Sequence, residues 1–293
     1  MSYVLPYASR SVSRGSCSIP VRGPLRIEDE LIHALDYLYS KGIVINQFHL
    51  TATTTGASET VSIARLTTYY DTTIDWGDGS APETLVANVT TARTHVYATA
   101  GTYPITVNHA HLITQLQIDN AKLGGLDTSE LQYSVLTYFW VTLATGCTID
   151  SADMVDWRPT YWYLSSMPTG TYSISSANMV DWRPTTWQLF SMPAAGSSYT
   201  FAASCMRAWT ALATLTMNDL GLDAAAIDAV LADLYAGRMG YTAAAPTAAM
   251  GGTNADPTGV YQAMVPPTTG METKYELIND SASQGFKKWA ITT

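Results

Sequence analysis

The chain has 293 residues, which is enough for two domains or for one domain with an elongated module. Only 13% of the residues are charged, about half the usual share, and this composition is more typical of β-rich extracellular or virion proteins than of cytosolic enzymes. The net charge of −9 argues against general nucleic-acid binding.

Residues 1–24 predict an extended basic arm, because prolines interrupt any helix and Ser, Arg and Gly lower the drive to pack. Residues 1–26 contain four arginines and no acid, a charge of +4, which leaves −13 for the remainder of the chain. The arm can dock on an acidic partner surface, or it can be a disordered terminus without a role, and both interpretations stay open. The candidate docking residues are Arg10, Arg14, Arg22 and Arg26.

Residues 25–42 predict a short helix. Its first turn carries three acids, where the helix dipole favours negative charge, and Gly42 provides a stop. Leu31, Leu35 and Leu38 fall on one apolar face. That face must pack against the chain's own body or against a neighbouring subunit, and the pattern does not separate the two.

Residues 43–110 predict an antiparallel β-sandwich. Ile74 and Trp76 alternate with polar residues, as in a half-buried strand, and the sequence Gly-Asp-Gly that follows indicates a turn. This stretch resembles a PKD domain, whose hallmark W-G-D-G-x is followed by H-x-Y and G-x-Y-x-V/I. The residues that match the pattern are Trp76, Asp78, Gly79, His95, Tyr97 and Tyr103.

The PKD resemblance implies an immunoglobulin-like sandwich that serves as a spacer or binding module on a surface protein. Trp76 is then the core anchor, with Tyr97 and Tyr103 packed nearby, and the first strands are expected within 43–54 and 59–67. Calcium binding at Asp75 and Asp78 would need about six to eight oxygen ligands, and only these two carboxylates can be named. We therefore expect the two acids to brace the turn.

Residues 111–222 predict a stack of repeated coils. The segment 154–160, Met-Val-Asp-Trp-Arg-Pro-Thr, recurs at 179–185, a period of 25 residues, and the next step is 27. Such a period is typical of a solenoid in which each coil buries its apolar side against the next. The segments 113–120 and 212–218 resemble L-x-x-L-x-L-x-x-N, which implies leucine-rich-repeat-like coils.

The coils are rich in Trp and Tyr, whose rings can form an internal stack or an outward binding platform. Trp157 and Trp182 share one repeat position, and we expect them to stack in the core. The next pair of tryptophans follows a Pro-Thr turn signal, so we expect this pair at the surface beside the repeat's arginines. The candidate platform for a glycan or protein partner is Trp162, Trp187, Arg158 and Arg183.

Residues 223–293 predict a helical cap over the last coil, followed by a closing strand at 289–292. An amphipathic helix begins at Asp223, which can cap it, and a second helix is expected near 272–283. The segment from Gly251 to the closing strand resembles the C-terminal end of leucine-rich-like surface proteins of tailed bacteriophages and some bacteria, although three extra residues precede Trp289 in this chain.

Cys17, Cys147 and Cys205 are too few and too widely spaced for a disulfide framework or a paired-cysteine zinc site, and one bridge between Cys147 and Cys205 stays open. The sequence has no G-x-S-x-G, Walker A or H-E-x-x-H signature. We therefore expect no enzyme activity, no cofactor and no metal. We also expect no membrane span, because no apolar run approaches the necessary length, and no signal peptide.

The predicted fold class is mainly β with some α: an immunoglobulin-like PKD sandwich, then a short leucine-rich-repeat-like solenoid with a helical C-terminal cap. The resemblances favour a non-enzymatic structural or adhesive protein at the virion surface of a bacteriophage, of the capsid-decoration, head-fibre or tail-fibre type. The expected partners are other virion or surface proteins through residues 1–42, further copies of the chain, and a host-surface glycan or protein. The alternative is a bacterial or archaeal cell-surface adhesin or extracellular filament subunit.

Overall fold

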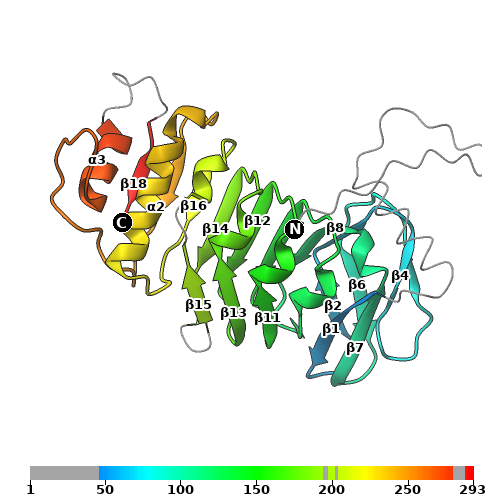
Figure 1. Cartoon of the computed structure of the whole chain (residues 1–293). Helices are drawn as coiled ribbons and strands as arrows, with labels where there is room; N and C mark the ends of the chain where they lie inside the picture. The colour runs from blue at the N-terminus through cyan, green and yellow to red at the C-terminus, as the bar shows by residue number, and fades with distance from the viewer. Residues whose placement is uncertain (1–45, 194–196, 202–203, 280–287) are drawn as a thin grey trace, which may run out of the picture. The chain divides into compact units, whose positions relative to one another are not determined.

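The computed structural model describes residues 46–193, 197–201, 204–279 and 288–293. The predicted basic arm and the predicted helix of residues 1–42 lie outside these ranges. The described part is mainly β, with two α-helices near its C-terminal end and short 3-10 helices between strands (Figure 1).

The first strands pair antiparallel in a five-stranded sheet of order β5-β4-β7-β1-β9 and in a two-stranded sheet of β2 with β6. The run predicted as one strand from Glu59 is interrupted at Ala64, and its second half, β3, joins a different sheet. The strands of this region are β1 (Gln47–Thr54), β2 (Glu59–Ile63), β3 (Arg65–Thr68), β4 (Thr72–Asp75), β5 (Glu83–Leu85), β6 (Arg93–Tyr97), β7 (Gly101–Asn108) and β9 (Leu123–Gly124).

The rest of the chain winds through coils that add one parallel strand each to a growing sheet. This sheet has eight strands in the order β18-β17-β16-β14-β12-β10-β8-β3, with only β3 antiparallel to its neighbour. Its strands after β3 are β8 (Ile113–Ile118), β10 (Tyr138–Thr142), β12 (Tyr161–Ser165), β14 (Thr186–Phe190), β16 (Thr214–Thr216), β17 (Thr247–Ala249) and β18 (Ala290–Thr292).

A second parallel sheet of three strands belongs to the same coils, and short helices lie between the strands. The strands are β11 (Cys147–Asp150), β13 (Gly170–Ser175) and β15 (Ser197–Thr200). The 3-10 helices are η1 (Ala110–Leu112), η2 (Thr128–Leu131), η3 (Ser151–Met154), η4 (Ser176–Met179), η5 (Met206–Ala208) and η6 (Arg238–Gly240).

The coils lengthen towards the C-terminus. The residues paired side by side in successive strands are Tyr138, Tyr161, Thr186, Thr214, Thr247 and Ala290. Their separations are therefore 23, 25, 28, 33 and 43 residues. The predicted period of 25 holds for the step from β12 to β14, and the two longest steps contain α2 (Ala224–Gly237) and α3 (Gly270–Asn279).

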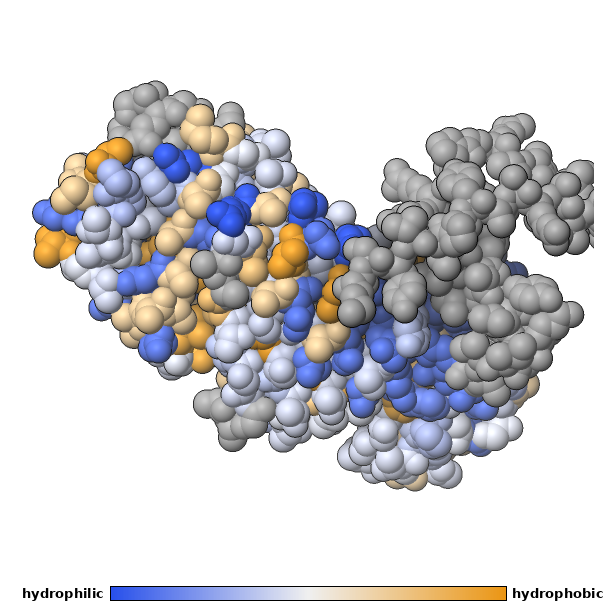
Figure 2. Space-filling model, in the orientation of Figure 1, coloured by the Kyte–Doolittle hydropathy of each residue, from blue (hydrophilic) through white to orange (hydrophobic). Residues whose placement is uncertain are grey.

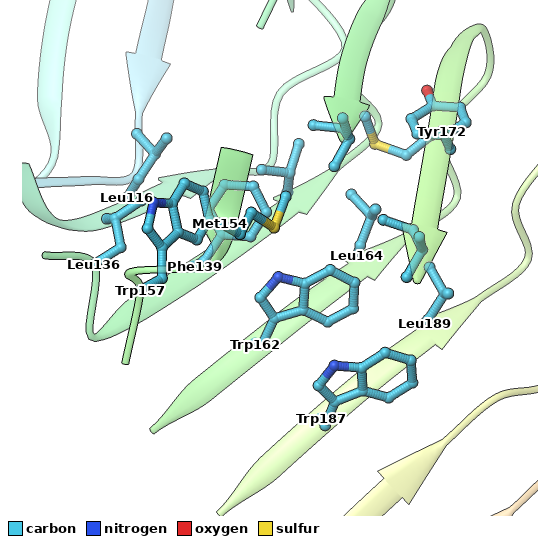
Figure 3. Close-up of a cluster of buried hydrophobic side chains, with 14 of the residues drawn as sticks. Leu116, Leu136, Phe139, Met154, Trp157, Trp162, Leu164, Tyr172, Trp187 and Leu189 are labelled. Atoms are coloured by element: carbon cyan, nitrogen blue, oxygen red, sulfur yellow. The ribbon is translucent and has the colours of Figure 1, made fainter. Parts of the chain in front are cut away.

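The core is a continuous set of columns that run across the strands. One residue from each strand of the eight-stranded sheet lies at the same register and is buried. Figure 3 shows four of them: Leu116, Phe139, Trp162 and Trp187. From β3 to β18 this column is Leu66, Leu116, Phe139, Trp162, Trp187, Leu215, Ala248 and Ile291. The rings of Trp162 and Trp187 stack with centroids 4.9 Å apart, so each coil covers the ring of the coil before it.

A second set of tryptophans joins the coils through hydrogen bonds. Trp157 and Trp182 are buried, as predicted, but their rings lie tilted against Phe139 and Trp162 instead of forming the expected stack. Each indole N–H donates to the last backbone carbonyl of the previous coil's 3-10 helix. Between the last two of these coils, the donor is a tyrosine hydroxyl in place of an indole N–H. The donor-to-acceptor pairs are Trp157 to Leu131 at 3.1 Å, Trp182 to Met154 at 3.2 Å, Trp209 to Met179 at 3.1 Å and Tyr241 to Met206 at 3.2 Å.

The antiparallel strands and the coils share sheets as well as a core. β1 pairs with β9 of the first coil, and β3 pairs with β8. The backbone N–H and the ring of His49 both contact the carboxylate of Glu130. Residues 45–293 accordingly group into one unit.

One exposed and one buried acid, Asp223 and Glu272, cap the C-terminal helices. Asp223 caps α2 by accepting from the N–H of Ala226, as predicted. Glu272, in the first turn of α3, accepts from the side chain of Gln262 and from the N–H groups of Thr268 and Thr269. These hydrogen bonds, the one from Gln262 foremost, lower the pKa of Glu272 to about 2.

We expect acid to weaken the α3 region through Glu272. The carboxylate's contribution is complete above its ordinary pKa of 4.5 and is lost as the pH falls through about 2. At pH 6, the Glu272→Gln variant should therefore have a lower free energy of unfolding than the wild type. Near pH 2 the two proteins should have similar free energies of unfolding. Urea unfolding followed by circular dichroism measures both differences. An equal difference between the two proteins at both pH values would contradict this assignment.

Candidate functional site

Strand alternation places two different layers of aromatic side chains on β10, β12 and β14. Because successive side chains point to opposite faces of a sheet, the second and fourth residues of these strands are buried, and the residues between them are half-buried apart from the buried Ser165. The half-buried rings form a continuous outward surface, which we name the aromatic face. Its members are Tyr138, Trp140, Tyr161, Tyr163 and Phe190.

The rings of the aromatic face contact one another across the strands. Tyr138 and Tyr161 stack with centroids 4.8 Å apart and planes at 10°. Trp140 and Tyr163 are 4.7 Å apart but tilted by 41°, and Phe190 meets Tyr163 edge-on at 5.4 Å. Each of these side chains is half-buried, so part of every ring in the layer reaches solvent.

Neutral amides and one guanidinium border the rings. Arg65 lies over the ring of Tyr138 at 4.1 Å and donates to the side-chain oxygen of Gln115. The Tyr138 hydroxyl donates to Gln117, and Gln188 donates to Thr216 on the next strand. Each amide is thus held at the outer side of the sheet with hydrogen-bonding capacity to spare.

The members of the aromatic face are uncharged near neutral pH, and the charged side chains beside it are Arg65 and Asp119, whose carboxylate accepts from Gln117. Burial raises the pKa of Tyr138, although the neighbouring Arg65 opposes the shift. Burial and the nearby Tyr163 also raise the pKa of Tyr161. Both phenols therefore remain protonated hydroxyls, able to donate and to accept hydrogen bonds.

The predicted platform needs correction. Trp162 and Trp187 are fully buried in the inner column and cannot meet a partner. Arg158 and Arg183 are exposed, but each guanidinium donates to two backbone carbonyls at its own coil's corner, those of Val155 and Trp157 in the case of Arg158. The four residues therefore do not form one surface.

A signal for the correct surface was present in the sequence. Leu164 follows Trp162 by two residues, and a strand's period of two places both on the same inward face. The same rule turns Tyr161 and Tyr163 outward. The Pro-Thr turn signal had indicated where the strand begins but not which of its faces is exposed.

The residues of the W-G-D-G pattern gather at the turn after β4. Trp76 is buried, its ring stacks on His95 at 5.2 Å, and its carbonyl accepts from the Tyr97 hydroxyl at 2.9 Å. Tyr103 stacks on Tyr97 at 4.2 Å. Gly79 lies at the turn with a positive φ of 84°.

The acids of this turn brace its backbone. Asp75 accepts from the N–H of Gly77, and Asp78 accepts from Ser80 and contacts the His95 ring at 2.7 Å. The hydrogen bonds from Ser80, and then from His95, hold the pKa of Asp78 well below its usual range. Both carboxylates are thus committed to protein groups.

Cys147 and Cys205 are buried free thiols, so the bridge left open by the sequence is not formed. Burial raises the pKa of Cys147 to about 11, which makes it a poor nucleophile. Within the ranges that the structure describes, no three His, Cys, Asp or Glu side chains are arranged to hold a metal ion. The docking arginines Arg10, Arg14, Arg22 and Arg26 lie outside those ranges.

The visible face in Figure 2 carries hydrophobic residues in scattered groups over the coils and the C-terminal cap, not in one continuous patch. Among the described residues, no helix is both long enough and apolar enough to cross a bilayer.

The chain matches no protein-family model, and searches of curated proteins and of solved structures give no match.

Proposed function

We propose that this chain is a non-enzymatic structural and adhesive surface protein, a bacteriophage virion component of the capsid-decoration, head-fibre or tail-fibre type. The observation that carries the proposal is the aromatic face, whose half-buried rings lie on a parallel sheet with a tightly packed inner side. Aromatic side chains held rigidly at a surface are the groups that contribute most to recognition interfaces.

The rest of the body supports a rigid display role. The contacts around Trp76 support a PKD-type, immunoglobulin-like arrangement of β1 to β7, which would act as a spacer. The parallel coils support a leucine-rich-repeat-like solenoid. Because these parts share sheets and a core, a load on one part is transmitted to the other without a flexible linker.

The alternative proposal is a bacterial or archaeal surface adhesin or filament subunit with the same binding face. Mass spectrometry of particles purified after lysis of the source culture separates the two. Recovery of the chain with capsid and tail proteins supports the virion proposal. Recovery only with the cell envelope contradicts it and supports the adhesin.

The basic arm gives a second test. We expect deletion of residues 1–24 to abolish incorporation into particles, because the arm would supply the contact to an acidic neighbour. The remaining chain should keep its circular dichroism spectrum, since residues 45–293 form their own unit. Glutamine at Arg10, Arg14, Arg22 and Arg26 serves as the matched charge-only variant. Normal incorporation of the deletion variant would refute the anchoring role.

A further inference from the structure

We propose that the aromatic face binds a neutral polysaccharide chain that lies across the strands of the eight-stranded sheet. The proposal deepens the adhesive role proposed above by naming a ligand class and the residues that hold it. It rests on the chemistry of the face, on its charge and on its dimensions.

The chemistry of the face matches that of a sugar ring. The faces of the half-buried Trp140 and Tyr163 rings carry the negative side of the ring quadrupole, which attracts the weakly positive C–H groups on the flat side of a pyranose. The amides of Gln117 and Gln188 and the hydroxyls of Tyr161 and Tyr163 lie beside these rings, where they can exchange hydrogen bonds with sugar hydroxyls.

The charge of the face selects a neutral ligand. The eight strands of the sheet contain one charged residue, Arg65, and this guanidinium is engaged by Tyr138 and Gln115. The charge next to the strands at this face is a carboxylate, that of Asp119, which accepts from Gln117. Residues 27–293 carry a charge of −13, given +4 in residues 1–26 and −9 overall. An acidic polymer would therefore be repelled by the body and would find no free cation on this sheet.

The dimensions of the face favour a linear polymer over a second copy of the chain. The rings and amides of the face lie on four neighbouring strands, β8, β10, β12 and β14. Four strands about 4.8 Å apart span about 14 Å, and the three outward positions of β10 or β14 extend about 14 Å from first to last, or about 200 Å² in all. A stable protein interface needs about 800 Å² on each partner. A surface of this size is too small for a stable protein interface but accommodates a short stretch of an extended sugar chain.

Affinity electrophoresis of the full chain tests the proposal. Native gels would contain dextran, mixed-linkage β-glucan or galactomannan as neutral probes, and alginate as an acidic probe. We expect at least one neutral probe to retard the wild type, alginate not to do so, and Tyr163→Ala to weaken the apparent affinity at least tenfold. Tyr133→Ala is the matched control, because Tyr133 is 55% exposed but lies outside the sheet.

Gln188→Ala supplies a second variant that removes no ring, and we expect it to weaken retardation several-fold even where Tyr163→Ala fails to fold. Any of four results would overturn the proposal: no retardation by the neutral panel, retardation by alginate alone, unchanged retardation of both face variants, or a solution dimer in light scattering that Tyr163→Ala dissociates. Particle composition tests the virion proposal separately, so failure of one proposal is distinguishable from failure of the other.

Discussion

Replacing Trp182 with alanine is expected to cost about 3–5 kcal/mol of unfolding free energy, the range for removing a large buried aromatic side chain. Trp182 is fully buried between coils, its indole donates to Met154, and its ring packs at 6.2 Å from that of Trp162. Since domains are stable by only about 5–15 kcal/mol, urea unfolding followed by circular dichroism should show a large loss of stability.

A pair of phenylalanine variants separates the contribution of the indole hydrogen bond to stability from the contribution of ring packing. The indole N–H of Trp187 has no acceptor among the described residues, whereas that of Trp182 does. Trp→Phe removes a similar volume at both positions. At Trp182 it also removes a hydrogen bond worth about 1 kcal/mol, while at Trp187 it removes a buried, unsatisfied donor.

We therefore expect Trp182→Phe to be less stable than Trp187→Phe by at least about 1 kcal/mol. Phe139 already occupies the column position equivalent to Trp187, which shows that a phenyl ring fits this column. If both variants lost the same free energy of unfolding, the indole-to-carbonyl hydrogen bonds between coils would contribute nothing to stability.

Much of the architecture was predictable because it repeats. The Met-Val-Asp-Trp-Arg-Pro-Thr repeat indicated stacked coils, and in the structure each copy is followed directly by a strand, β12 or β14, and the two strands pair in parallel. Helix α2 was predictable from Asp223 and its apolar face, and it begins at the following residue. These elements carry local signals strong enough to be read without knowledge of tertiary contacts.

Other parts depend on tertiary pairing. β17 consists of Thr-Ala-Ala, which has little strand propensity, and it forms because β16 and β18 lie on either side of it. The indole bonds between coils join residues 26 to 30 positions apart, so no local pattern reveals them. For the aromatic face, the ring types were visible in the sequence, but the choice of the exposed layer was wrong because a turn signal was given more weight than strand alternation.

The turn after β4 contains two glycines that differ in the space available to a side chain. Gly77 and Gly79 both have positive φ, 78° and 84°, where any other residue is strained by about 1–2 kcal/mol. A Cβ at Gly79 would meet nothing within 4 Å. A Cβ at Gly77 would lie 2.1 Å from the backbone oxygen of Pro104 and cannot be accommodated without backbone movement.

We expect Gly79→Ala to cost about 1 kcal/mol and Gly77→Ala about 3 kcal/mol or more, because overpacking adds to the backbone strain. The movement would be transmitted widely, since Pro104 lies in β7, which pairs with both β1 and β4, and β1 in turn pairs with the first coil. Thermal unfolding of the two variants measures the difference. Similar melting temperatures would show that the turn can rearrange without moving β7. That result would contradict the proposal that shared sheets make the body rigid.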